Sequence, residues 1–109
     1  MDLEEIQRKV VAVSKIYTEK YGIKRDDDWF LLKLQEEIGE LTQGYLSLTN
    51  RGKTRGMDRT QVRQDFADEL SDVFGQILLI ANHQDIDIVK GLERKWFKYL
   101  PPLANLDSR

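Results

Sequence analysis

The stretches that decide the fold read Lys33-Leu-Gln-Glu36-Glu37-Ile-Gly-Glu40 and, 28 residues later, Glu69-Leu-Ser-Asp72. Residues three apart in an α-helix lie about 60° apart around the axis, so each carboxylate pair, Glu37 with Glu40 and Glu69 with Asp72, shares a face. Both pairs stand in an otherwise apolar helical pattern. If the two faces meet, four carboxylates come together, and a divalent cation is the natural way to offset their repulsion.

Apolar residues recur at three- and four-residue steps in four segments, which predicts an all-α bundle of four main helices. Gly22 is the expected C-terminal cap of the first helix, and Asp26, Asp27 and Asp28 supply oxygens to cap the second. Thr60 is the expected cap of the third helix. The segments are expected at about 3–22, 29–49, 60–83 and, opening at Asp85 or Asp87, up to Pro101 and Pro102.

The two central helices are expected to place their carboxylates at one height. The midpoint of Glu37 and Glu40 lies about ten residues, or roughly 15 Å, before the expected end of the second helix. The midpoint of Glu69 and Asp72 lies about as far after the expected start of the third. An antiparallel hairpin therefore brings the two pairs level.

The composition indicates one domain spanning residues 1–109, with residues 101–109 as a tail. The net charge of −2 gives no general attraction to a nucleic acid polymer or an anionic membrane, so a polyanionic ligand must be held locally. No run approaches the ~18 apolar residues of a membrane span, and the acidic N-terminus lacks a signal sequence. We therefore expect a cytoplasmic protein.

The ligand types at this site favour a hard metal ion. The chain has no cysteine, which excludes disulfides and thiolate zinc sites, and its one histidine, His83, lies eleven residues beyond Asp72. The Glu-x-x-His pattern of di-iron bundles is missing. Carboxylates alone favour Mg²⁺, with Mn²⁺ as a substitute, and Mg²⁺ commonly completes its octahedron with substrate phosphates. The sequence thus points to a phosphorylated substrate.

Lys33-x-x-Glu36-Glu37-x-x-Glu40 followed by Glu69-x-x-Asp72 resembles the signature of the MazG-type nucleotide pyrophosphohydrolases, in the all-α NTP pyrophosphatase superfamily. The resemblance covers residues 28–99. It implies a homodimer or homotetramer that uses Mg²⁺ to hydrolyse a nucleoside triphosphate to the monophosphate and pyrophosphate, in housekeeping of the nucleotide pool. By position it implies Glu37, Glu40, Glu69 and Asp72 as metal ligands and Glu36 as an accessory catalytic carboxylate. Either Glu36 or Glu40 could accept the proton of the attacking water.

Three further residues are candidates for substrate binding. Lys33 lies one turn before Glu37 and either reaches a phosphate or pairs with a carboxylate. Trp29 either stacks on a base or packs in the core or a subunit interface. Lys95 matches a lysine that family members carry in the fourth helix, but Tyr99 stands where they carry asparagine.

The remaining charged and aromatic residues are open to two readings. The loop residues Arg51, Lys53, Arg55 and Arg59 either close over a triphosphate or are solvated. Asp65 and Asp68 are expected on a solvated face, and Trp96 and Phe97 in a dimer contact. A phosphoribosyl-ATP pyrophosphohydrolase-like enzyme, whose branch also carries Lys-x-x-Glu-Glu-x-x-Glu, is one alternative. A non-catalytic helical bundle that senses nucleotides or binds a partner is another.

Overall fold

The computed structural model describes residues 1–102 and contains no strand within them. Its elements are α1 (Leu3–Lys20), α2 (Asp27–Leu48), α3 (Arg59–His83), α4 (Ile88–Lys95) and the short 3₁₀ helix η1 (Phe97–Tyr99). The expectation of an all-α fold with four main helices is confirmed. The expected tail at 101–109 lies almost wholly outside the described residues. No helix among residues 1–102 has the length and apolar character that crossing a membrane requires.

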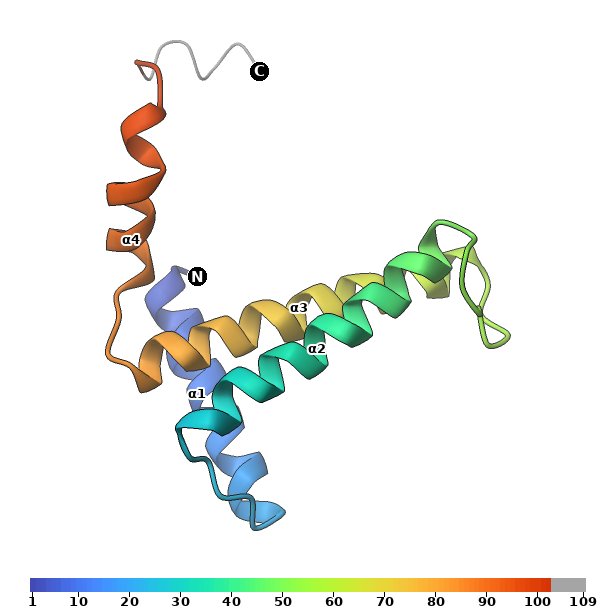
Figure 1. Cartoon of the computed structure of the whole chain (residues 1–109), viewed down its shortest axis with the longest axis horizontal. Helices are drawn as coiled ribbons and strands as arrows, with labels where there is room; N and C mark the ends of the chain where they lie inside the picture. The colour runs from blue at the N-terminus through green and yellow to red at the C-terminus, as the bar shows by residue number, and fades with distance from the viewer. Residues whose placement is uncertain (103–109) are drawn as a thin grey trace.

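The packed body of the protein is made by three helices. α2 and α3 run antiparallel and side by side over most of their length, and α1 crosses them at a steep angle and packs on α3 (Figure 1). α4 leaves the end of α3, extends away from this body and packs mainly on η1 (Figure 1). The fourth helix therefore does not complete the expected bundle.

Each α-helix begins at an aspartate whose carboxylate accepts a backbone N–H three residues on, at 2.9 to 3.1 Å. These caps are Asp2, Asp26, Asp58 and Asp87. The expectation that Thr60 caps the third helix is wrong. Asp58 takes that position because the Gln61 side chain also accepts a hydrogen bond from the Asp58 N–H at 2.9 Å, which closes a capping box.

The first three helices end in the same way, with one residue in the left-handed conformation. At these positions, Gly22, Asn50 and Asp85, φ is 63°, 62° and 55°. The backbone N–H of the next residue then donates to a carbonyl in the last helical turn, at 2.9 Å for Ile23 to Thr18 and 2.8 Å for Ile86 to Ala81. The Gly22 cap is as predicted.

The core is small. The buried apolar side chains are Phe30, Val62, Leu78, Leu79 and Ala81. The Gln76 side chain donates to the Phe30 carbonyl at 3.1 Å, and His83 stacks on the Phe30 ring while its Nε2 lies 2.7 Å from Asp27. These contacts hold the start of α2 against the end of α3 and so fix the register of the hairpin.

Candidate metal centre

Four carboxylates converge halfway along the α2–α3 hairpin. Glu37 and Glu40 come from α2, and Glu69 and Asp72 from α3. When one carboxylate oxygen is taken from each residue, the four oxygens all lie within 4.8 Å of one another. The predicted equal height of the two pairs is therefore confirmed, and all donor atoms of the cluster are carboxylate oxygens.

Two carboxylates of the cluster point inward. Glu37 and Glu69 are half-buried, whereas Glu40 and Asp72 are exposed. The Oε2 atoms of Glu37 and Glu69 are buried and have no hydrogen-bond partner. A buried carboxylate oxygen without a partner is costly, and a cation between the two helices would satisfy both atoms.

The protonation of the inner carboxylates reflects this crowding. Burial raises the pKa of Glu37, and the negative charges of Glu40 and Asp72 raise it further, against the opposing effect of Lys33. Burial also raises the pKa of Glu69, again assisted by Glu40 and Asp72. Both groups therefore bind protons more readily than an exposed glutamate does, so binding of a cation competes with their protonation.

Lys33 and Glu36 lie beside the cluster rather than in it. The Lys33 ammonium contacts Glu36 at 3.3 Å and Glu37 at 3.6 Å, so the pairing alternative for this lysine is observed. Burial lowers the pKa of Lys33, but the hydrogen bond that Lys33 donates to Glu36 and the charges of Glu36 and Glu37 raise it more, and the net shift is upward. The Glu36 side chain remains 58% exposed.

A cavity of about 530 Å³ opens on one side of the cluster, between α1 and the hairpin. Glu37 and Asp72 form its acidic wall, Lys33 lies at the same wall, and Trp29 and Tyr17 contribute aromatic surface. The structure thus brings two of the three predicted substrate-binding residues, Trp29 and Lys33, to the carboxylates.

A second cavity, of about 770 Å³, opens on the other side. Glu40 and Glu69 line it, together with the loop residues Lys53 and Arg55. Asp65, expected on a solvated face, is half-buried and also lines this cavity. The four carboxylates are therefore shared between a cavity with aromatic surface and a cavity lined by two cations and three carboxylates.

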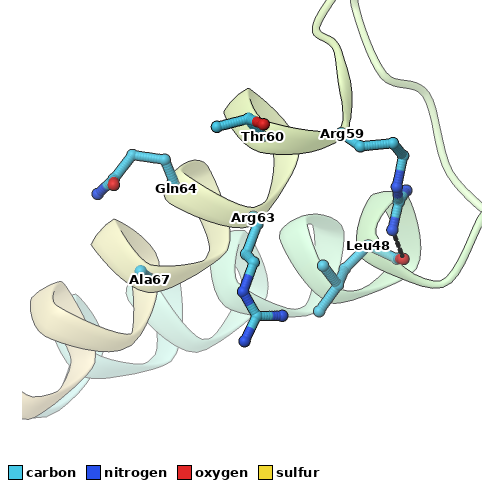
Figure 2. Close-up of a pocket in the computed structure, with 6 residues that line it drawn as sticks. All are labelled: Leu48, Arg59, Thr60, Arg63, Gln64 and Ala67. Atoms are coloured by element: carbon cyan, nitrogen blue, oxygen red, sulfur yellow. Dashed lines mark hydrogen bonds between the residues drawn. The ribbon is translucent and has the colours of Figure 1, made fainter.

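Lys95 is not brought to the cluster. It is exposed in the last turn of α4, which extends away from the hairpin (Figure 1), and it lines neither cavity beside the carboxylates. A further shallow cavity of about 470 Å³, at the start of α3, is lined by Arg59 and Arg63 but by none of the four carboxylates (Figure 2).

Sequence reasoning missed the contribution of α1 to the first cavity. Tyr17 fitted the apolar stripe of the first helix, and Ser71 and Gln76 carried no motif, yet all three line this cavity. Their shared signal is only that each lies within one turn of an apolar core position, which does not separate cavity lining from packing.

Comparisons with protein-family models, with curated proteins and with solved structures found no match.

Proposed function

We propose that this protein is a nucleoside triphosphate pyrophosphohydrolase that uses Mg²⁺ and releases the nucleoside monophosphate and pyrophosphate. The observation that carries the proposal is the cluster of Glu37, Glu40, Glu69 and Asp72, whose chosen oxygens lie within 4.8 Å of one another. Two buried oxygens without partners, on Glu37 and Glu69, support a cation at this point. The motif that resembles the MazG-type signature supports the reaction class.

The donor set fits a hard divalent ion. Glu37, Glu40, Glu69 and Asp72 would hold it, and they offer oxygen ligands only. When bound, Mg²⁺ would neutralise charge on the phosphates and lower the pKa of a water molecule. Within residues 1–102 the only ion pair that the four carboxylates form joins Glu37 to Lys33, so negative charge remains available for the ion.

The reaction balances with groups already in the site. The oxygen of water bonds to the α-phosphorus, and the bond from that phosphorus to the oxygen bridging to the β-phosphate breaks. The bridging oxygen keeps the electron pair and leaves as part of pyrophosphate. The water proton passes to Glu36 or Glu40, the two candidate bases. Glu40 belongs to the cluster, whereas Glu36 stands one residue before Glu37 and is held by Lys33.

The cavity between α1 and the hairpin fits the nucleoside end of the substrate. Trp29 offers an aromatic face for stacking, and Lys33 stands between this face and Glu37. Most of the wall is apolar, with Val10, Val13 and Leu79 beside Trp29, which suits an uncharged base rather than a phosphate.

We further infer that the enzyme works as a homodimer or homotetramer. The accessible surface is 8728 Å², whereas a compact monomer of 12.8 kDa exposes roughly 6,300 Å². The excess matches the ~1,000–2,500 Å² that one partner buries in an obligate homodimer. Val13, Ile16 and Trp96 are each 66% exposed, and Leu32 is 65% exposed. A second copy is the simplest cover for apolar surface of this extent, including Trp96 and Phe97 on the segment that extends from the body.

The deciding experiment is a pyrophosphate-release assay over canonical and modified nucleoside triphosphates, and over phosphoribosyl-ATP, with Mg²⁺ or Mn²⁺. Turnover of a nucleoside triphosphate that is lost in Glu37→Gln and Asp72→Asn supports the proposal. Turnover of phosphoribosyl-ATP alone favours the alternative enzyme. Binding of nucleotides without pyrophosphate release favours the sensing bundle, and equal rates in wild type and both variants refute the site.

A further inference from the structure

The basic residues of the α2–α3 connection do not share one role. Arg51 lies over the Tyr45 ring, with its guanidinium carbon 5.3 Å from the ring centre, and its Nε donates to Thr49 at 3.0 Å. Arg59 donates to the Leu48 carbonyl at 2.7 Å (Figure 2), and also to Asn50. Both arginines therefore stabilise the end of α2, and their guanidinium groups are already engaged.

Lys53 and Arg55 differ from these two arginines. Both line the 770 Å³ cavity that also contains Glu40 and Glu69. In residues 1–102 neither forms an ion pair with a carboxylate at 4.0 Å or less. Two cations thus share a cavity with the cluster without being neutralised by it.

The loop that carries these cations is fixed against α2. The Ser47 hydroxyl donates to the Lys53 carbonyl at 2.6 Å, and the N–H groups of Arg51 and Gly52 both donate to the Leu46 carbonyl, at 2.7 and 2.9 Å. A Cβ atom at Gly52 would lie 3.0 Å from Leu46 Cβ and from the Ser47 nitrogen, so only glycine allows this approach without displacement. The loop backbone is therefore held against α2 at Arg51, Gly52 and Lys53.

We propose that Lys53 and Arg55 bind the β- and γ-phosphates of the substrate and hold pyrophosphate as it leaves, an inference that rests on the function proposed above. The substrate then lies across the carboxylate cluster in one direction only. Its uncharged base occupies the cavity walled by Trp29 and Tyr17, and its charged end occupies the cavity walled by the two loop cations. The first cavity supplies aromatic and apolar surface for the base, and the second supplies the two loop cations beside Glu40, Asp65 and Glu69, whose charge a bound metal ion would offset.

The cations also act on the leaving group. Charge grows on the bridging oxygen when its bond to the α-phosphorus breaks, and this oxygen stays with the two terminal phosphates. Lysine and arginine next to those phosphates offset the charge by hydrogen bonds to charged oxygens, which are among the stronger hydrogen bonds in proteins. A substrate that lacks the terminal phosphates, such as a monophosphate, gains nothing from these residues.

The test uses the full chain and inorganic tripolyphosphate with Mg²⁺, which reports on phosphate binding without any turnover. The variants are Lys53→Gln and Arg55→Asn, alone and together. Asparagine suits the left-handed φ of 53° at position 55, and the Lys53 backbone contact to Ser47 does not depend on the side chain. Arg63→Gln is the matched control, since it removes one positive charge near the same loop but from the separate cavity in Figure 2.

We expect each single variant to weaken tripolyphosphate binding about tenfold and the double variant more, because a hydrogen bond to a charged group contributes roughly this factor. Arg63→Gln should stay within about twofold of wild type. The inference is overturned if wild type does not bind tripolyphosphate, if the double variant binds it as tightly as wild type, or if Arg63→Gln weakens it equally. If the wild type binds tripolyphosphate through Lys53 and Arg55 but releases no pyrophosphate from any nucleoside triphosphate, the proposed function is refuted and the phosphate-binding site is retained.

Discussion

Removing one inner carboxylate should stabilise the metal-free protein. At 4.8 Å two unit charges repel by about 1 kcal/mol at the dielectric constant of water and by about 3.5 kcal/mol at an effective value of 20. Glu37 faces three such neighbours, of which Glu40 and Asp72 are exposed, so the lower figure applies to most of its repulsion. Glu37→Gln also gives up the contact with Lys33 at 3.6 Å, which contributes at most about 1 kcal/mol.

The net expectation for Glu37→Gln is a gain of about 1–2 kcal/mol without metal, or roughly 5–10 °C in Tm. The assay is thermal unfolding followed by circular dichroism at one fixed protein concentration, with EDTA and with excess Mg²⁺. Mg²⁺ should raise the Tm of the wild type and leave that of the variant nearly unchanged. Asp68→Asn is the control, because it removes an exposed carboxylate of α3 outside the cluster and should change stability by less than about 0.5 kcal/mol in EDTA.

Two results would refute this reasoning. If Glu37→Gln unfolds at a lower temperature than wild type in EDTA, the carboxylates are not under mutual repulsion. If Mg²⁺ stabilises both proteins equally, the ion does not bind at Glu37.

Three other predictions follow from burial, backbone and protonation. Folding raises the pKa of Glu37 and Glu69, so the folded state binds more protons than the unfolded state does. Metal-free stability should therefore decline as pH rises from 4.5 through the raised pKa values, and the Mg²⁺-induced rise in Tm should vanish as pH falls through them. A pH series of melting curves with and without Mg²⁺ checks both signs. Leu78→Ala, at a side chain that is 1% exposed, should cost about 2–5 kcal/mol in urea unfolding, and a loss below 1 kcal/mol would show that the small core is not the main support of the hairpin. Gly39→Ala should raise stability by up to about 1 kcal/mol, because an added Cβ meets nothing within 4 Å. Gly22→Ala should lower it by about 1–2 kcal/mol, because alanine is strained at a φ of 63°. The opposite order in the same urea titration would contradict the helical conformation of Gly39 and the left-handed conformation of Gly22.

The helices and the carboxylate cluster could be predicted from the sequence because both depend on local periodicity. Glu37 and Glu40 share a face of any α-helix. This pair and the pair Glu69 and Asp72 lie equally far from the connecting loop, so an antiparallel hairpin was expected to bring them level. The N-cap of α3 shows where local reasoning fails. Thr60 and Asp58 are both good caps, and the choice was made by Gln61, whose side chain returns a bond to Asp58.

The walls of the two cavities could not be predicted, because they depend on how elements pack. Periodicity places Tyr17 on the apolar face of α1, but it does not determine the angle at which α1 crosses the hairpin. The sequence therefore could not show that Tyr17 and Trp29 line the same cavity. The sequence alone gave no reason to assign different roles to the four loop cations, Arg51, Lys53, Arg55 and Arg59. The structure separates them, because the Arg51 guanidinium lies over Tyr45 and donates to Thr49, whereas Lys53 lines the cavity that contains Glu40 and Glu69.

The position of the cluster halfway along the hairpin has a consequence for how such a protein can diverge. An insertion or deletion among residues 49–58 leaves the four carboxylates at the same height, because contacts between the start of α2 and the end of α3 fix the register. It alters only the loop that lines the second cavity. One residue added between Phe30, at the packed start of α2, and Glu37 instead turns the α2 pair by about 100° and moves it about 1.5 Å against α3. Loop length can therefore vary without separating the carboxylates, whereas the number of residues between the packed ends and each carboxylate pair has to be kept.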